Sequence, residues 1–128
     1  MAGELILIIE DQEKNRKLAR DVLEVRGYRT LETSTGEEGI DLARDQQPAL
    51  VLLDIHLPGI DGIETFQRLR TDPVTAAIPV IAVTASAMPD DRVRIKAVGF
   101  DRYLSKPINI KLFLEVVDEL LDARGSGP

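Results

Sequence analysis

Five short apolar runs alternate with five longer amphipathic stretches along this chain. The apolar runs, each expected to form a strand, are residues 5–9, 28–33, 50–53, 80–83 and a weaker run at 102–104. The amphipathic stretches, each expected to form a helix, are residues 13–26, 35–44, 62–71, 90–98 and 108–123. Strands joined by helical crossovers lie parallel, and the crossovers place helices on both faces of the sheet. The alternation therefore predicts a doubly wound α/β fold with a five-stranded parallel sheet.

The first expected helix allows its buried face to be predicted. Within residues 13–26, Leu18, Val22 and Val25 recur at helical spacing, so we expect these three side chains to face the core. Gly27 follows directly and is a plausible C-cap for this helix.

Size and charge limit the domain count and the kinds of partner. The chain has 128 residues, the usual size of one domain, so we expect a single domain at residues 1–123 and a flexible tail at residues 124–128. The 16 Lys and Arg residues against 22 Asp and Glu residues give a net charge of −6, which opposes attraction to nucleic-acid phosphates and anionic membranes. We expect neither as a direct partner.

The chain contains no cysteine and a single histidine. It therefore cannot form a disulfide, a thiolate nucleophile or a histidine-rich metal centre, and any metal must be held by oxygen atoms. The longest apolar stretch, residues 76–83, is too short to span a bilayer, and the first four residues lack the basic start of a signal peptide. We expect a cytoplasmic protein.

The residues that follow the apolar runs can carry chemistry, because the carboxyl ends of the strands in a doubly wound sheet border one crevice. These residues are Glu10, Asp11, Asp54, Thr84, and Lys106 with Pro107. Three carboxylates that converge there would repel one another unless a cation lay among them. Oxygen ligands alone suit Mg²⁺, for which Mn²⁺ could substitute. Since the sequence has no glycine-rich phosphate loop, nucleotide binding has little support.

Each of these residues also has an ordinary structural explanation. Asp11 could cap the helix that follows it, Thr84 alone would be an ordinary strand residue, and Lys106 could be a solvated surface lysine. A bond before proline can be cis, however, and a cis Lys106–Pro107 bond would turn the lysine toward the acidic residues. Asp54 precedes a loop with no obvious helix for it to cap, so a structural explanation is weakest there.

Four segments of the chain resemble the response-regulator receiver domain of two-component signalling, in particular single-domain regulators similar to CheY and DivK. They are residues 8–11, 53–62, 83–88 and 103–108, in this order. The resemblance runs from about Glu4 to Leu121. It implies a flavodoxin-like, CheY-like (βα)5 sheet with the strand order 2-1-3-4-5.

The resemblance implies a phosphoacceptor and a metal site. Asp54 would accept a phosphoryl group from a histidine kinase or histidine phosphotransferase in a magnesium-dependent reaction. Asp11 would bind the metal directly, Glu10 through water, and His56 through its backbone carbonyl, which leaves the imidazole of His56 exposed. The acidic pair is Glu-Asp here, where Asp-Asp is also common in the family.

The resemblance also implies a switch. Lys106 would pair with a phosphoryl oxygen, and Thr84 would donate to another. Thr84 and Tyr103 would then change position, and a downstream protein would bind the face made by the fourth helix, fifth strand and fifth helix, residues 90–121. Such a domain catalyses only its own phosphorylation and dephosphorylation.

Four alternatives remain open at this point. The chain could be the receiver of a hybrid histidine kinase, or a pseudo-receiver that is not phosphorylated, although all the site residues are in place. A phosphohydrolase that forms a phosphoaspartate usually has a second acid two residues after the nucleophile, where this chain has His56. A flavin-binding module needs a phosphate-binding loop after the first strand, where residues 10–12 are Glu-Asp-Gln.

Overall fold

The computed structural model of the chain describes residues 3–85 and 89–125. Ser86, Ala87 and Met88 of the segment at 83–88, and residues 126–128 of the expected tail, lie outside the described residues. The strands are β1 (Leu5–Ile9), β2 (Arg29–Thr33), β3 (Leu50–Asp54), β4 (Val80–Thr84) and β5 (Arg102–Ser105). The helices are α1 (Glu13–Val25), α2 (Gly36–Gln46), α3 (Gly62–Thr71), α4 (Pro89–Val98) and α5 (Ile110–Gly125).

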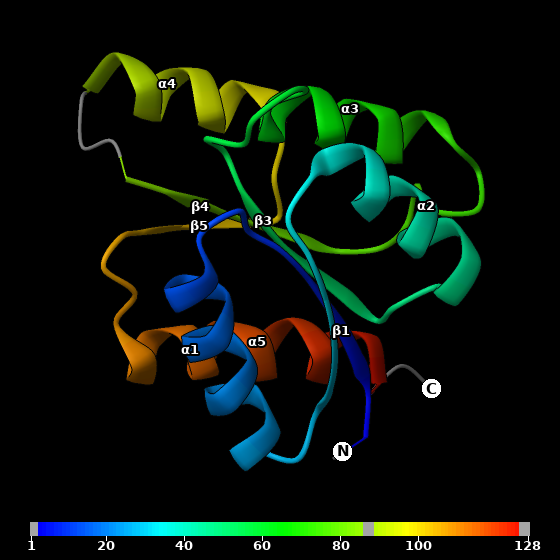
Figure 1. Cartoon of the computed structure of the whole chain (residues 1–128), viewed down its shortest axis with the longest axis vertical. Helices are drawn as coiled ribbons and strands as arrows, with labels where there is room; N and C mark the ends of the chain where they lie inside the picture. Colours follow the sequence, from blue (N-terminus) through cyan, green and yellow to red (C-terminus); the bar gives the residue numbers. More distant parts are fainter. Residues whose placement is uncertain (1–2, 86–88, 126–128) are drawn as a thin grey trace.

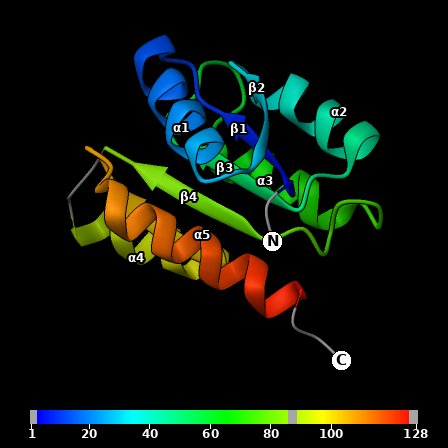
Figure 2. The same cartoon turned by 90° about the horizontal axis from the view of Figure 1, so that it is seen from below.

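The five strands form one parallel sheet in the order β2-β1-β3-β4-β5. Helices α1 and α5 cover one face, while α2, α3 and α4 cover the other (Figure 1). The view from below places α5 in front and α4 behind it (Figure 2). This arrangement confirms the predicted fold class and strand order. Each parallel crossover carries its helix to one or the other face of the sheet.

Alternate residues of the strands supply the two halves of the core. On β1, Ile6 and Ile8 pack with α1 and α5, whereas Leu7 and Ile9 pack with α2 and α3. Strands β3 and β4 are buried along their whole length, which explains why their sequences are apolar without alternation. Within the described residues, no helix is both long and apolar enough to cross a membrane.

The face of α1 differs from the prediction. Leu18 is 40% exposed and Val25 is 90% exposed, whereas Ala19 and Leu23 are buried against the sheet. Val22 packs partly against the core. The buried face is therefore rotated from the predicted one, and only Val22 lies near its border.

Gly27 follows the end of α1. The C-cap residue is Arg26, and Gly27 adopts a φ of 101°, a left-handed conformation that favours glycine. The N–H groups of Gly27 and Tyr28 donate to the carbonyls of Glu24 and Leu23, at 3.0 Å each. This pair of hydrogen bonds satisfies the last carbonyls of the helix and turns the chain into β2.

Candidate metal and phosphoacceptor site

Three carboxylates lie together at the carboxyl ends of β1 and β3. Glu10 and Asp11 follow β1, and Asp54 is the last residue of the neighbouring strand β3. One carboxylate oxygen from each lies within 4.8 Å of the others. Glu10 is 6% exposed and Asp54 is 3% exposed, whereas Asp11 is open to solvent. The expected convergence of the three residues is present because parallel neighbouring strands end at the same edge of the sheet.

Lys106 brings a positive charge between the two buried carboxylates. Its Nζ lies 2.8 Å from Oε1 of Glu10 and 3.0 Å from Oδ2 of Asp54. The lysine follows β5, where its backbone N–H donates to the carbonyl of Thr84 at 2.8 Å, and the Lys106–Pro107 peptide bond is cis. The side chain therefore points into the acidic cluster, as the sequence analysis expected, and does not lie free in solvent.

The pKa values at this cluster follow from burial and charge. Burial raises the pKa of Glu10 above its usual value, and the charge of Asp54 adds to this effect, while hydrogen bonds from Lys106 and Gln12 oppose it. Burial alone would lower the pKa of Lys106, but hydrogen bonds and charges from Glu10 and Asp54 outweigh burial and raise it. Lys106 is therefore held in its charged form and serves as the counter-ion of the cluster.

The loop after β3 supplies backbone donors. The N–H of His56 donates to Oδ1 of Asp54 at 2.9 Å, so the two carboxylate oxygens of Asp54 contact different groups. The imidazole of His56 is exposed, and its Nε2 lies 3.5 Å from Oγ1 of the buried Thr84. The sequence analysis did not predict this contact, because nothing in the sequence indicates how the loop is folded over β4.

The first turn of α3 lies directly against the end of β3. A Cβ atom on Gly62 would come within 2.4 Å of the carbonyl oxygen of Asp54 and 2.6 Å of Cα of Ile55. The N–H of Gly62 donates to the carbonyl of Ile55 at 2.9 Å. Glycine is therefore required at this position by the close approach of two backbone segments.

Asp11 does not cap α1. The N-cap residue is Gln12, and its N–H donates to Oε2 of Glu10 at 3.0 Å. The carboxylate of Asp11 is therefore not used in the helix start. Capping of α1 therefore does not explain the aspartate at position 11.

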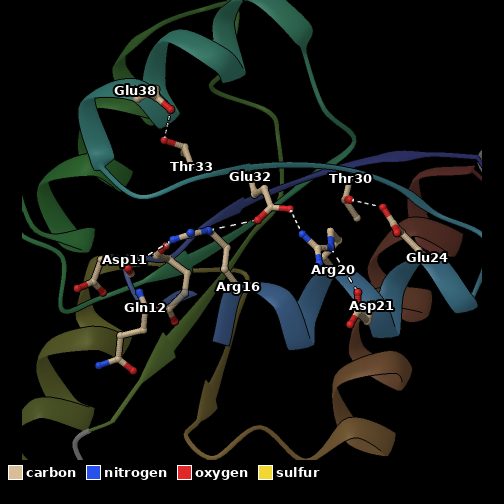
Figure 3. Close-up of polar contacts among 11 residues, drawn as sticks. Asp11, Gln12, Arg16, Arg20, Asp21, Glu24, Thr30, Glu32, Thr33 and Glu38 are labelled. Carbon is tan, nitrogen blue, oxygen red and sulfur yellow. Dashed lines mark hydrogen bonds and ion pairs between the residues drawn. The ribbon is translucent and has the colours of Figure 1, made fainter. Parts of the chain in front are cut away.

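Arg16 is a neighbour of the site that sequence reasoning missed. Its Nη1 donates to the backbone carbonyl of Glu10 at 2.9 Å and lies 3.4 Å from that of Asp11 (Figure 3). In the sequence Arg16 is one of several charged residues in an amphipathic stretch. No pattern there distinguishes it from a solvated surface arginine.

Tyr103 lies on the edge strand β5 and is 37% exposed. Nζ of Lys96, on α4, lies 5.7 Å from the centre of its ring. The side chain is therefore partly exposed and lies beside Lys96 of α4.

The donor set of the acidic cluster fits a hard divalent cation. The ligands that the structure brings together are all oxygen atoms, from the carboxylates of Glu10, Asp11 and Asp54. Oxygen-only sites with few protein ligands suit Mg²⁺ better than zinc.

The comparisons with known proteins agree with this geometry. A family model described as the response regulator receiver domain matches residues 6–118. The polar-differentiation response regulator DivK of Brucella ovis is 46% identical over 116 residues, which cover 91% of this chain and 94% of DivK, and DivK of Brucella suis matches equally well.

Solved structures match over almost the whole chain. The receiver domain of a sensor histidine kinase from Pseudomonas aeruginosa, with a magnesium ion coordinated in its active-site cleft, is 28% identical with a TM-score of 0.87, covering 94% of this chain and 98% of that one. A CheY-like receiver domain protein from Methanospirillum hungatei is 28% identical with a TM-score of 0.88 and covers 98% of both chains.

Proposed function

Because this chain belongs to the response regulator receiver family, we propose that Asp54 is the residue that accepts the phosphoryl group. A carboxylate oxygen of Asp54 attacks phosphorus, and an O–P bond forms while the P–N bond to a phosphohistidine donor breaks. The donor imidazole leaves, and Asp54 becomes an acyl phosphate. The donor is a histidine kinase or a histidine phosphotransferase.

The other residues of the cluster reduce the charge repulsion that opposes this reaction. Lys106 binds a phosphoryl oxygen, and Thr84 and backbone N–H groups of the β3–α3 loop donate to the others. Asp11, Asp54 and the backbone carbonyl of His56 would hold Mg²⁺, with Glu10 acting through water, and the bound ion would supply positive charge beside the phosphoryl group. Mn²⁺ would substitute for it.

One observation carries the proposal. Lys106 contacts both Glu10 and Asp54, at 2.8 and 3.0 Å. Here the cation is shared, so a phosphoryl group on Asp54 finds a positive charge already within reach.

We further propose that phosphorylation changes how this domain binds a downstream protein. Thr84 and Tyr103 act as the switch residues, and the partner binds the face made by α4, β5 and α5. The domain acts in the cytoplasm and turns over no other substrate. Its last helix runs to Gly125, so residues 124 and 125 of the expected tail belong to α5 and not to a tail. We favour a regulator resembling DivK over the receiver of a hybrid kinase, since DivK matches the chain at higher identity than the kinase receiver does.

The test is phosphorylation of the purified protein by acetyl phosphate, read as intact mass. With Mg²⁺ the parent protein gains one phosphoryl group, which hydroxylamine removes, and EDTA prevents the gain. Asp54→Asn gains none. Asp61→Asn, a matched change at a carboxylate that caps α3, gains it normally. A gain of phosphoryl mass in Asp54→Asn, or a gain in the parent protein that EDTA does not prevent, contradicts the proposal.

A further inference from the structure

Arg16 binds the backbone of the acidic pair itself. It is the fourth residue of α1, and its guanidinium folds back over the start of the helix (Figure 3). Nη1 donates to the carbonyl of Glu10 at 2.9 Å and lies 3.4 Å from the carbonyl of Asp11. These two peptide groups connect β1 to α1, so their orientation determines where the side chains of Glu10 and Asp11 point.

A second layer of contacts fixes Arg16. Its Nε donates to Oε1 of Glu32 on β2 at 3.2 Å, and Oε2 of the same carboxylate accepts from Nη1 of Arg20 at 2.9 Å. Glu32 pairs in register with Ile8 of β1. The guanidinium is thus held between the edge strand and the acidic loop, because its planar group offers several donors in a fixed arrangement.

Glu10 and Asp11 depend on Arg16 to different extents. The N–H of Glu10 donates to the carbonyl of Thr33 at 3.0 Å, and its carboxylate contacts Lys106 and the N–H of Gln12. Asp11 is exposed, and in residues 3–85 and 89–125 the structure gives its carboxylate no hydrogen bond. The peptide between Asp11 and Gln12 is held by two contacts, the hydrogen bond from the N–H of Gln12 to Glu10 and the contact of its carbonyl with Arg16.

From these contacts we infer that Arg16 is a positioning residue for the divalent-metal ligands Glu10 and Asp11. The inference rests on the proposed function, since it concerns the same acidic site. Residues that orient metal ligands without touching the metal commonly affect affinity by tenfold or more. Arg16 acts on the backbone of the ligands and not on their carboxylates.

The direction in which the Mg²⁺ affinity changes when Arg16 is removed distinguishes a positioning role from an effect of its charge. A cation close to the site repels Mg²⁺, so its removal through charge alone tightens binding. Loss of positioning weakens binding. Arg20 is a matched control, because it has the same charge and contacts the same Glu32 but does not reach the carbonyls of Glu10 or Asp11.

The experiment measures the Kd for Mg²⁺ by titration calorimetry, with urea unfolding of the metal-free proteins alongside it. We expect Arg16→Gln to raise the Kd roughly tenfold and Arg20→Gln to leave it within about twofold, although both variants lose a surface ion pair of similar small energy. Glu32→Gln, which releases Arg16 without removing it, gives an intermediate Kd. Saturating Mg²⁺ restores the acetyl phosphate reaction of Arg16→Gln.

The outcomes are distinct. A parental or tighter Kd in Arg16→Gln, or an equal loss in Arg16→Gln and Arg20→Gln, overturns the inference. If Arg16→Gln does not fold, Glu32→Gln decides, and a parental Kd there rejects the positioning role. A parent protein that binds no Mg²⁺ would instead contradict the proposed function.

Discussion

Lys106 stabilises two buried carboxylates at once, so its removal affects more than one partner. Lys106→Met leaves Glu10 and Asp54 without the cation that contacts both. We expect the metal-free variant to lose about 2 kcal/mol of unfolding free energy, somewhat less than for a fully buried pair because water reaches the edge of the site. Urea unfolding with and without Mg²⁺ measures the loss.

Magnesium ions provide the internal control for this prediction. A divalent ion replaces the missing charge, so Mg²⁺ stabilises Lys106→Met more than it stabilises the parent protein. Lys111→Met, a change at an exposed lysine on α5, leaves stability and its Mg²⁺ dependence unaltered. An equal Mg²⁺ effect in Lys106→Met and the parent would contradict the counter-ion role.

Tyr28 gives a pH-dependent prediction remote from the site. Burial raises its pKa above the ordinary value of 10.0, and the hydrogen bond from its hydroxyl to Asp118 raises it further. Because the folded-state pKa is raised, this stabilisation is complete below pH 10.0 and is lost as the pH rises through the folded-state pKa. In Tyr103→Phe, the ultraviolet absorbance of Tyr28 therefore changes only above pH 10.0 while circular dichroism reports folded protein.

The Asp118 partner can be tested in the same way. Adding Asp118→Asn removes a negative charge beside the hydroxyl and lowers the pKa of Tyr28 toward 10.0. Ionisation of Tyr28 at its ordinary pKa in the folded Tyr103→Phe protein would show that the hydroxyl is not held as described.

At the residue scale, sequence motifs located the groups that meet at the strand ends but not the groups that hold them. Asp54 and Lys106 could be predicted to meet because each stands at the carboxyl end of a strand, and these ends lie at one edge of the sheet. The contacts of Arg16 with the acidic loop and of His56 with Thr84 depend on side-chain rotation and loop shape. Neither is determined by the order of residues along one segment.

At the scale of single elements, α1 shows how a helix face can be predicted wrongly. Leu18, Val22 and Val25 have helical spacing, but so have Ala19 and Leu23, and the second set is buried. Helical spacing alone does not distinguish the two sets. The structure selects the second because alanine lets α1 approach the sheet closely, which a bulkier residue would prevent.

This rotation of the α1 face predicts opposite outcomes for two similar truncations. Leu23→Ala removes a fully buried side chain and should cost about 3 kcal/mol of unfolding free energy. Val25→Ala, at a residue that is 90% exposed, should change stability by less than about 0.5 kcal/mol. Urea unfolding of both variants checks the prediction, and a larger loss in Val25→Ala would restore the face that the sequence predicted.

At the scale of the whole molecule, the two helices of the proposed output face, α4 and α5, bury different numbers of side chains in the core. Helix α5 buries Phe113, Val116 and Val117, whereas Ile95 is the buried side chain among residues 92–98 of α4. Elements with few buried contacts open locally at low free-energy cost. We therefore expect the amides of α4 to exchange faster with solvent than those of α5.

Amide exchange with beryllofluoride, a mimic of the phosphoryl group, tests how this difference is used. Binding at Asp54 should change exchange in α4 and around Tyr103 by roughly fivefold, which corresponds to about 1 kcal/mol of coupling. The inner turns of α5, held by the buried core, serve as the unaffected control. Changes confined to the loops around Asp54 would mean that the signal leaves the domain by another surface.

The fold as a whole was predictable because it follows from the alternation of strands and helices. This alternation can be recognised even when the predicted ends of single elements are wrong by one or two residues. Strand β2 begins one residue later than expected and α5 begins two residues later, at Ile110, yet the order of elements and the strand order are unaffected. The site was predictable for the same reason, since it is assembled by topology. The way its signal reaches a partner depends on small free-energy differences between states, which a sequence pattern does not record.

The contact between Gly62 and the end of β3 gives α3 a mechanical part in the site. Alanine usually suits a helix better than glycine by roughly 0.5–1 kcal/mol, but at this position its methyl group would push on the Asp54 peptide. The backbone of α3 therefore contacts the end of β3 directly, next to the proposed phosphoacceptor Asp54. We therefore expect a protein that binds and displaces α3 to change the reactivity of Asp54 without touching its side chain.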